Sequence, residues 1–183
     1  MSERLAPWSE YVDLLKPAGE LRSLLLDPES EQLRAELYRQ LLMNLSSGYF
    51  LYFQSSPEHP DWAPFLNSVF VLQPNPDDTY LLAPLRGDGV YRISGTRGTV
   101  KLLTFSTGRN MMGMSAEPGR NFDYFDADDL ALGADGTLEV ILSAERPAGH
   151  QGNWWPLHRE AEFILVRQRS YDWGREQDAR LAI

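Results

Sequence analysis

The sequence predicts an α+β protein in which a helical N-terminal segment packs on an antiparallel, jelly-roll-like β-sandwich or barrel. Three observations predict this class: helical patterns in the first third, a stretch with three prolines after them, and short β-patterned runs with glycine-containing turns thereafter. We expect a helical segment over 1–56, a proline-rich linker over 57–78 and a β domain over 79–183, together forming one structural unit.

The helical prediction is strongest in the stretch DPESEQLRAELYRQLLMNL. Asp27 is the expected N-cap and Pro28 the expected first helical residue. Leucines at every fourth position form one apolar face: Leu33, Leu37, Leu41 and Leu45. The pattern ends near Phe53. The preceding stretch, PWSEYVDLLKPAGELRSLLL, predicts two short helices interrupted at Pro17.

Alternating apolar and polar residues predict the strands of the β domain. The expected strands are 79–85, 89–95, 98–106, 137–144, 161–171 and 178–183. The turn sequences between them contain Gly87-Asp88-Gly89, Thr96-Arg97-Gly98 and Ala134-Asp135-Gly136.

Residues 107–131 show no clear period, and we expect a long loop there. This loop would either pack Met111, Met112 and Met114 over the end of a barrel or act as a functional cover.

Composition excludes several classes of function. The net charge of −9, from 17 basic and 26 acidic side chains, disfavours nucleic acid as a partner. The absence of cysteine excludes disulfides, thiolate nucleophiles and cysteine-based metal sites. The N-terminal stretch is charged throughout, which is not typical of a secretory signal, and the longest apolar run is far too short for a membrane span. We therefore expect a cytoplasmic protein without membrane partners.

An ordered set of motifs links the chain to a known family. NPDDTY, YRISGTRGTV, LGADGTLEVILSAERP, NWWPL and LVRQRSYDWGREQDARL occur in that order. This series resembles a group of bacterial proteins called domain of unknown function 1214, over about residues 70–183. The resemblance implies a jelly-roll-type barrel and assigns no reaction. Asp78 stands where the family pattern has Asn, and relatives often continue beyond the position of Ile183 into a further C-terminal region.

Acidic and histidine side chains are the candidate catalytic residues. Asp77 and Asp78 are adjacent, so on a strand they point to opposite faces. They either bond nearby backbone amides, as in Asx turns, or one of them is a general base whose pKa is raised by burial. His158 is the third candidate, as an acid or base.

Arginines and aromatic residues are the candidate ligand-binding groups. These are Tyr80, Arg92, Arg97, Arg167, Arg169 and Trp154. Arg167 and Arg169 follow an apolar run on one strand face, so each needs a carboxylate, a carbonyl or a ligand anion as its partner. The expected protein partners are Asp77, Glu139, Glu145, Asp172 and Glu176. Two interpretations stay open: an internal arginine–carboxylate network, or a pocket for a substrate carboxylate or sulfate.

Known cofactor and nucleophile motifs are missing from the sequence. It contains no Gly-x-Ser-x-Gly elbow, phosphate-binding loop or Gly-x-Gly-x-x-Gly. His150 and His158 could ligate a metal together with Glu160 or Glu162, but the His-x-His spacing of jelly-roll metal sites is absent. We expect neither a metal nor a cofactor.

Two functions remain at this point. The first is binding of a hydrophobic small molecule, with or without an anionic group, in a barrel cavity. The protein would either only bind this molecule or convert it as a cofactor-free lyase, dehydratase or isomerase. The second is a noncatalytic accessory or oligomerisation domain, for instance a homodimer, that uses the long helix and Trp154, Trp155 and Trp173. An enclosed cavity with buried polar groups favours the first, whereas a solid core and exposed apolar surface favour the second.

Overall fold

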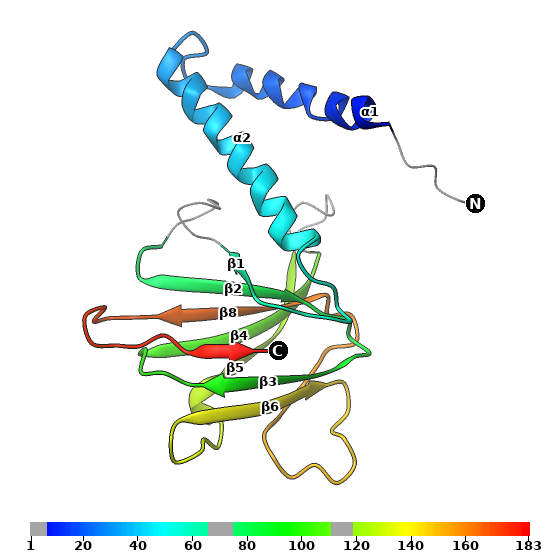
Figure 1. Cartoon of the computed structure of the whole chain (residues 1–183), viewed down its shortest axis with the longest axis vertical. Coiled ribbons are helices and arrows are strands. Elements are labelled where there is room, and N and C mark those ends of the chain that lie inside the picture. Colours follow the sequence, from blue (N-terminus) through cyan, green and yellow to red (C-terminus); the bar gives the residue numbers. More distant parts are fainter. Residues whose placement is uncertain (1–6, 66–74, 111–118) are drawn as a thin grey trace. The chain divides into compact units, whose positions relative to one another are not determined.

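The structure, a computed structural model, describes residues 7–65, 75–110 and 119–183. The chain divides into two compact units, Met1–Ser46 and Ser47–Ile183 (Figure 1). The first unit is helical, and the second contains two β-sheets. In the described ranges, no helix has both the length and the apolar character that crossing a membrane requires.

Three helical elements precede the sheets. They are α1 (Trp8–Asp13), the 3₁₀ helix η1 (Lys16–Leu24) and α2 (Glu31–Tyr52). The start of α2 differs from the prediction. Ser30 caps it, because its hydroxyl accepts a hydrogen bond from the Leu33 amide at 3.4 Å. The Asp27 carboxylate instead accepts from the Glu29 amide, only two residues on, and closes the preceding turn.

Nine strands form two sheets in the described part of the chain (Figure 1). The strands are β1 (Ala63–Phe65), β2 (Asp78–Pro84), β3 (Val90–Thr96), β4 (Leu102–Arg109), β5 (Arg120–Asp126), β6 (Thr137–Ser143), β7 (Trp154–Pro156), β8 (Phe163–Arg169) and β9 (Arg180–Ala182). The five-stranded sheet has the order β1-β2-β8-β4-β5 and is antiparallel throughout. The four-stranded sheet has the order β7-β6-β3-β9, with β6 and β7 parallel.

The α+β sandwich is confirmed, but the two sheets do not close into a barrel. Side chains of both sheets fill the space between them. Ile93 and Val140 from one sheet and Phe105 from the other are fully buried. The Trp155 ring lies 4.9 Å from that of Phe105 and 4.8 Å from that of Phe125, centroid to centroid. The closed barrel in which a ligand cavity was expected is therefore not present.

The prediction of a long loop over 107–131 is wrong for residues 107–109 and 120–126, which lie in strands. β4 extends to Arg109, and β5 pairs with it in antiparallel register. In the sequence of β5, RNFDYFD, apolar and polar residues alternate only weakly, so the sequence does not predict this strand. Met111, Met112 and Met114 lie outside the described residues.

Two further strands, β1 and β7, fall where no strand was expected. β1 lies inside the predicted linker 57–78, and β7 lies in the NWWPL motif. Each is three residues long, contains a proline and forms the edge of its sheet. Proline lacks an amide hydrogen and is tolerated at an edge, so it is a poor guide to whether such a strand exists.

Candidate functional site

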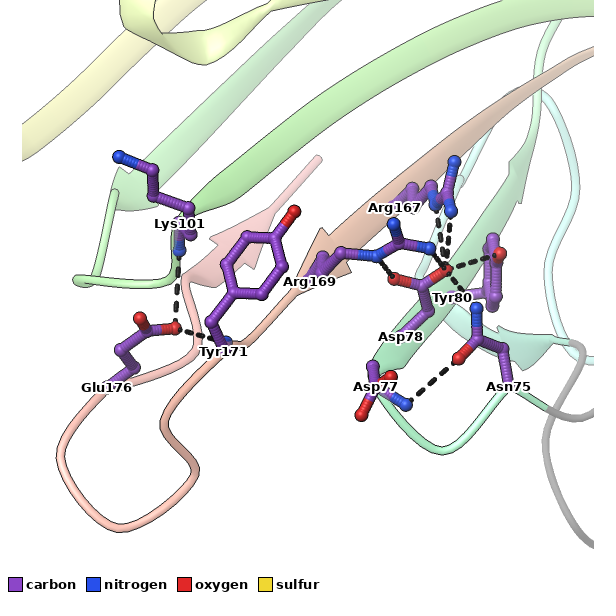
Figure 2. A network of polar contacts seen from close by, with 9 residues as sticks. All are labelled: Asn75, Asp77, Asp78, Tyr80, Lys101, Arg167, Arg169, Tyr171 and Glu176. Atoms are coloured by element: carbon purple, nitrogen blue, oxygen red, sulfur yellow. Dashed lines mark hydrogen bonds and ion pairs between the residues drawn. The ribbon is translucent and has the colours of Figure 1, made fainter.

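Asp78 is the centre of a polar network that joins β2 to β8 (Figure 2). It is the first residue of β2 and pairs in register with Arg169 at the end of β8. Arg169 donates from Nε to Oδ1 at 2.7 Å and from Nη2 to Oδ2 at 2.9 Å. Arg167, two residues earlier on the same face of β8, donates from Nε to Oδ2 at 2.9 Å, and its Nη2 forms an ion pair with the same oxygen at 2.7 Å. Two guanidinium groups thus share one carboxylate.

Two neutral groups complete the shell around this carboxylate. The Tyr80 hydroxyl donates to Oδ2 at 2.8 Å, and the Asn75 side-chain amide donates to the same oxygen at 2.9 Å. The Asp78 side chain is 0% exposed. Burial alone would raise the pKa of Asp78, but the hydrogen bonds from Arg169, Arg167 and Tyr80 outweigh burial and lower it to about 2.

The structure therefore corrects the proposed role of Asp78. A general base near neutral pH was expected to have a raised pKa, whereas Asp78 has a lowered one and its oxygens already accept several hydrogen bonds. The arginine–carboxylate network is present, but its partner is Asp78 rather than any of the five acids proposed from sequence. Glu176, one of those five, accepts instead from the backbone amides of Tyr171 and Lys101 (Figure 2).

The network carries an excess of positive charge. In the described ranges, Asp78 is the one carboxylate that pairs with Arg167 or Arg169. Their side chains are 39% and 27% exposed, respectively, so both guanidinium groups reach the surface. Hydrogen bonding to Asp78 raises the pKa of Arg169 further above its usual range. Burial raises the pKa of Tyr80, and the hydrogen bond to Asp78 adds to this rise, so its hydroxyl stays a donor.

A groove of about 530 Å³ lies on the outer face of the five-stranded sheet, next to this network. Residues of β2, β8, β4 and β5 line it, among them Tyr80, Arg167, Leu165, Leu102, Thr104, Tyr124 and Asp126. The strand register places four of them in one row across the sheet: Tyr80, Arg167, Thr104 and Asp126. On β8, the predicted alternation is confirmed, because Arg167 shares the outer face with Leu165 while Val166 is buried.

Arg97 and Trp154, both expected to bind a ligand, instead form hydrogen bonds within the protein. The Arg97 side chain is 10% exposed and donates to Asp128 Oδ1 and to the Val100 carbonyl. It anchors the turn between β3 and β4 and is not available to a ligand. The Trp154 indole donates to Ser143 Oγ at 3.0 Å. Its ring lines a wide surface hollow of about 1220 Å³, away from the Asp78 network.

The proposed catalytic residues are not brought together. The Asp77 carboxylate points away from Asp78 and lines a separate hollow with Ser170 (Figure 2). His158 stacks on Phe122 with 3.8 Å between centroids. It also lies near Gly87, beyond the far end of β2. That strand spans about 20 Å, so His158 cannot share a reacting group with either aspartate.

Arg92 is exposed on the outer face of the four-stranded sheet and is also separate from the groove. Within the three described ranges, no three histidine, aspartate or glutamate side chains form a group that could hold a metal ion. Of the sequence-predicted site residues, the structure assembles Asp78, Tyr80, Arg167 and Arg169. Asn75, Thr104 and Tyr124 were missed, since each is an ordinary polar or aromatic residue in its local pattern.

Comparison with known proteins supports the fold. No family model and no curated protein matches the chain. A crystal structure of an uncharacterised protein from Burkholderia cenocepacia is similar, with a TM-score of 0.79 and 29% sequence identity. The match covers 95% of this chain and 48% of that one, so the chain spans about half the length of its neighbour. Membership of the domain of unknown function 1214 family stays a prediction.

Proposed function

We propose that this chain is a noncatalytic interaction module that associates with a second copy of itself through its helical unit. The observation that carries the proposal is the burial pattern of this unit. α1 and η1 bury no residue, and the one buried residue of α2, Leu51, belongs to the β unit. Over its described residues, 7–46, the helical unit therefore has no core of its own.

Many large apolar side chains of this unit are exposed to solvent. Eleven lie between residues 8 and 45: Trp8, Tyr11, Val12, Leu14, Leu15, Leu21, Leu24, Leu26, Tyr38, Leu42 and Leu45. Trp8 is 80% exposed and Leu26 is fully exposed. Soluble proteins rarely leave so many large apolar groups uncovered in one segment without using them for contact.

The helices also need such contact for their own stability. α1 has six residues and η1 has nine, and isolated helices this short are marginal in water. Runs of 3₁₀ helix longer than about four residues are uncommon without tertiary support. An apolar partner surface would supply that support.

A second copy of the chain fits as the partner. Eleven apolar side chains at roughly 80 Å² each would bury about 900 Å² per protomer, close to the ~800 Å² per partner of a standard interface. A twofold axis would set the same surface of each copy against its counterpart, so one sequence supplies both sides. The filled core between the sheets also favours an interaction role over a ligand cavity in a barrel.

The experiment is sedimentation velocity on the whole chain at concentrations up to about 100 µM, with two matched variants. Leu42→Glu places a charge on the helical unit, and Val90→Glu places the same charge on β3, at side chains that are 65% and 66% exposed. We expect a dimer for the unchanged chain and for Val90→Glu. Leu42→Glu should weaken dimerisation by about tenfold or more, because it buries an unpaired charge. A monomeric unchanged chain, or equal weakening by both variants, would refute the proposal.

A further inference from the structure

We infer that the groove on the outer face of the five-stranded sheet binds a small organic monocarboxylate with an apolar body. Arg167 would hold the carboxylate group. This binding does not depend on the self-association proposed above. The volume of about 530 Å³ falls within the usual range of small-molecule sites.

The cationic end of the site follows from how Arg167 shares Asp78. A guanidinium group has five N–H donors, and Arg167 uses Nε and Nη2 on Asp78. In the described part of the chain, no hydrogen bond engages its Nη1 group. Asp78 also neutralises part of the charge of Arg169, so one carboxylate faces two cations. The unbalanced charge favours an incoming anion, and a carboxylate matches the planar donor geometry of arginine.

The surroundings of Arg167 hold it in place and offer a second donor. Its guanidinium carbon lies 5.8 Å from the centre of the Tyr80 ring, and the Tyr80 hydroxyl is fixed on Asp78. Thr104 is the register partner of Arg167 on β4, about 5 Å away across the sheet. Its hydroxyl can donate to the second oxygen of a carboxylate held by Arg167.

The apolar part of the ligand has a surface in the same groove. Leu165 lies two residues before Arg167 on the same face of β8, and Leu102 lies on the same face of β4. Tyr124 on β5 adds an aromatic wall. These side chains flank the cation on the sheet, so a chain or ring attached to the carboxylate can cover them.

The far side of the groove limits the charge of the ligand. Asp126 is the next residue in the row after Thr104, two strands and about 10 Å from Arg167. Asp129 lines the same side. Their negative charges would repel a second carboxylate carried at the other end of the ligand. The site should therefore prefer a monocarboxylate to a dicarboxylate of the same length.

Calorimetric titration of the whole chain with decanoate, decanamide and decanedioate tests this inference. We expect decanoate to bind several-fold more tightly than either of the other two. Arg167→Gln should weaken decanoate binding by about tenfold, the effect of losing a charged hydrogen bond. Arg92→Gln, which removes the same charge from the other sheet, should change it by less than about twofold. The inference would be wrong if decanamide bound as tightly as decanoate, or if Arg167→Gln and Arg92→Gln weakened decanoate binding equally.

A second variant, with a predicted gain in affinity, tests the site even if Arg167→Gln folds poorly. Asp126→Asn removes a negative charge from the groove and keeps the side-chain oxygen that accepts from the Asp128 amide. It should tighten decanoate binding by about twofold and reduce the preference over decanedioate. No gain in affinity for either acid would contradict the proposed position of the ligand.

Discussion

At the scale of single residues, Asp78 is an electrostatic anchor between β2 and β8. Its carboxylate joins the start of one strand to the end of its neighbour, through residues that are 91 positions apart in the chain. Breaking a buried ion pair by removing one partner is costly, because the remaining charge loses its compensation. Asp78 therefore matters most to the stability of the five-stranded sheet and to the position of Arg167.

Asp78→Asn should lower the free energy of unfolding by about 3 kcal/mol. This value is at the lower end of the range for breaking a buried ion pair, because both arginines are partly exposed. Asp77→Asn is the matched control at the adjacent, exposed carboxylate and should change it by less than about 0.5 kcal/mol. Urea denaturation at neutral pH measures both. If the two substitutions lowered the free energy of unfolding equally, Asp78 would not stabilise the sheet more than its exposed neighbour does.

The pH dependence of stability should report the same carboxylate. The pKa of Asp78 is lowered from its usual 3.8 to about 2 in the folded chain. The stabilisation, about 2 kcal/mol, is thus fully present above pH ~4 and is lost as the pH falls from about 4 to 2. The difference in unfolding free energy between the unchanged chain and Asp78→Asn should shrink over that window. A difference that stays constant down to pH ~2 would contradict the assignment.

At the scale of elements, the turn between β3 and β4 depends on a close approach of two backbones. Gly98 has a φ of 65°, and a Cβ atom there would clash with the Gln177 carbonyl. Gly136 has a φ of 79° but open space around it. Both glycines were predicted as turn residues from sequence, and the structure separates their roles.

Gly98→Ala should therefore destabilise the chain by about 2 kcal/mol or more, from backbone strain and steric clash together. Gly136→Ala carries the strain alone and should cost about 1 kcal/mol. Thermal unfolding of the two variants provides the comparison. Equal shifts in melting temperature would mean that the segment at Gln177 moves aside at little cost.

Elements with strong local patterns could be predicted from the sequence, and those shaped by pairing could not. The strands β2, β3, β4, β6, β8 and β9 lie close to their expected ranges. β5 was missed because its polar residues resemble a loop, and its pairing with β4 determines its conformation. In the site, alternation correctly placed Arg167 and Arg169 on one face of β8. Their partner could not be identified, because the register of β2 against β8 decides which acid meets them.

At the scale of the whole molecule, the two units differ in how they are stabilised. Both buried apolar clusters consist of residues between Leu51 and Ile183, so the β unit contains its own core. The part of the helical unit that the structure describes supplies exposed apolar surface and buries no residue. This contrast agrees with a structural role for the sandwich and a contact role for the helices.

A shortened chain that begins at Ser47 should keep cooperative unfolding. Its unfolding free energy should lie within about 1 kcal/mol of that of the Leu42→Glu variant at a concentration where that variant is monomeric. It should also be monomeric at every concentration tested. Denaturation and sedimentation together measure these properties. Loss of cooperative unfolding would show that the β unit requires residues before Ser47.

The short edge strands also affect how the protein behaves when concentrated. Pro64 in β1 and Pro156 in β7 leave one border of each sheet without a full set of amide donors, which hinders fibrillar growth by strand addition there. The opposite borders, β5 and β9, lack proline, and β5 carries Arg120, Asp123 and Asp126. Those charges oppose the addition of a strand from another chain at this edge. Protonation of Asp123 and Asp126 in acid would remove two of these three charges, while Arg120 stays charged, and would weaken this protection along β5.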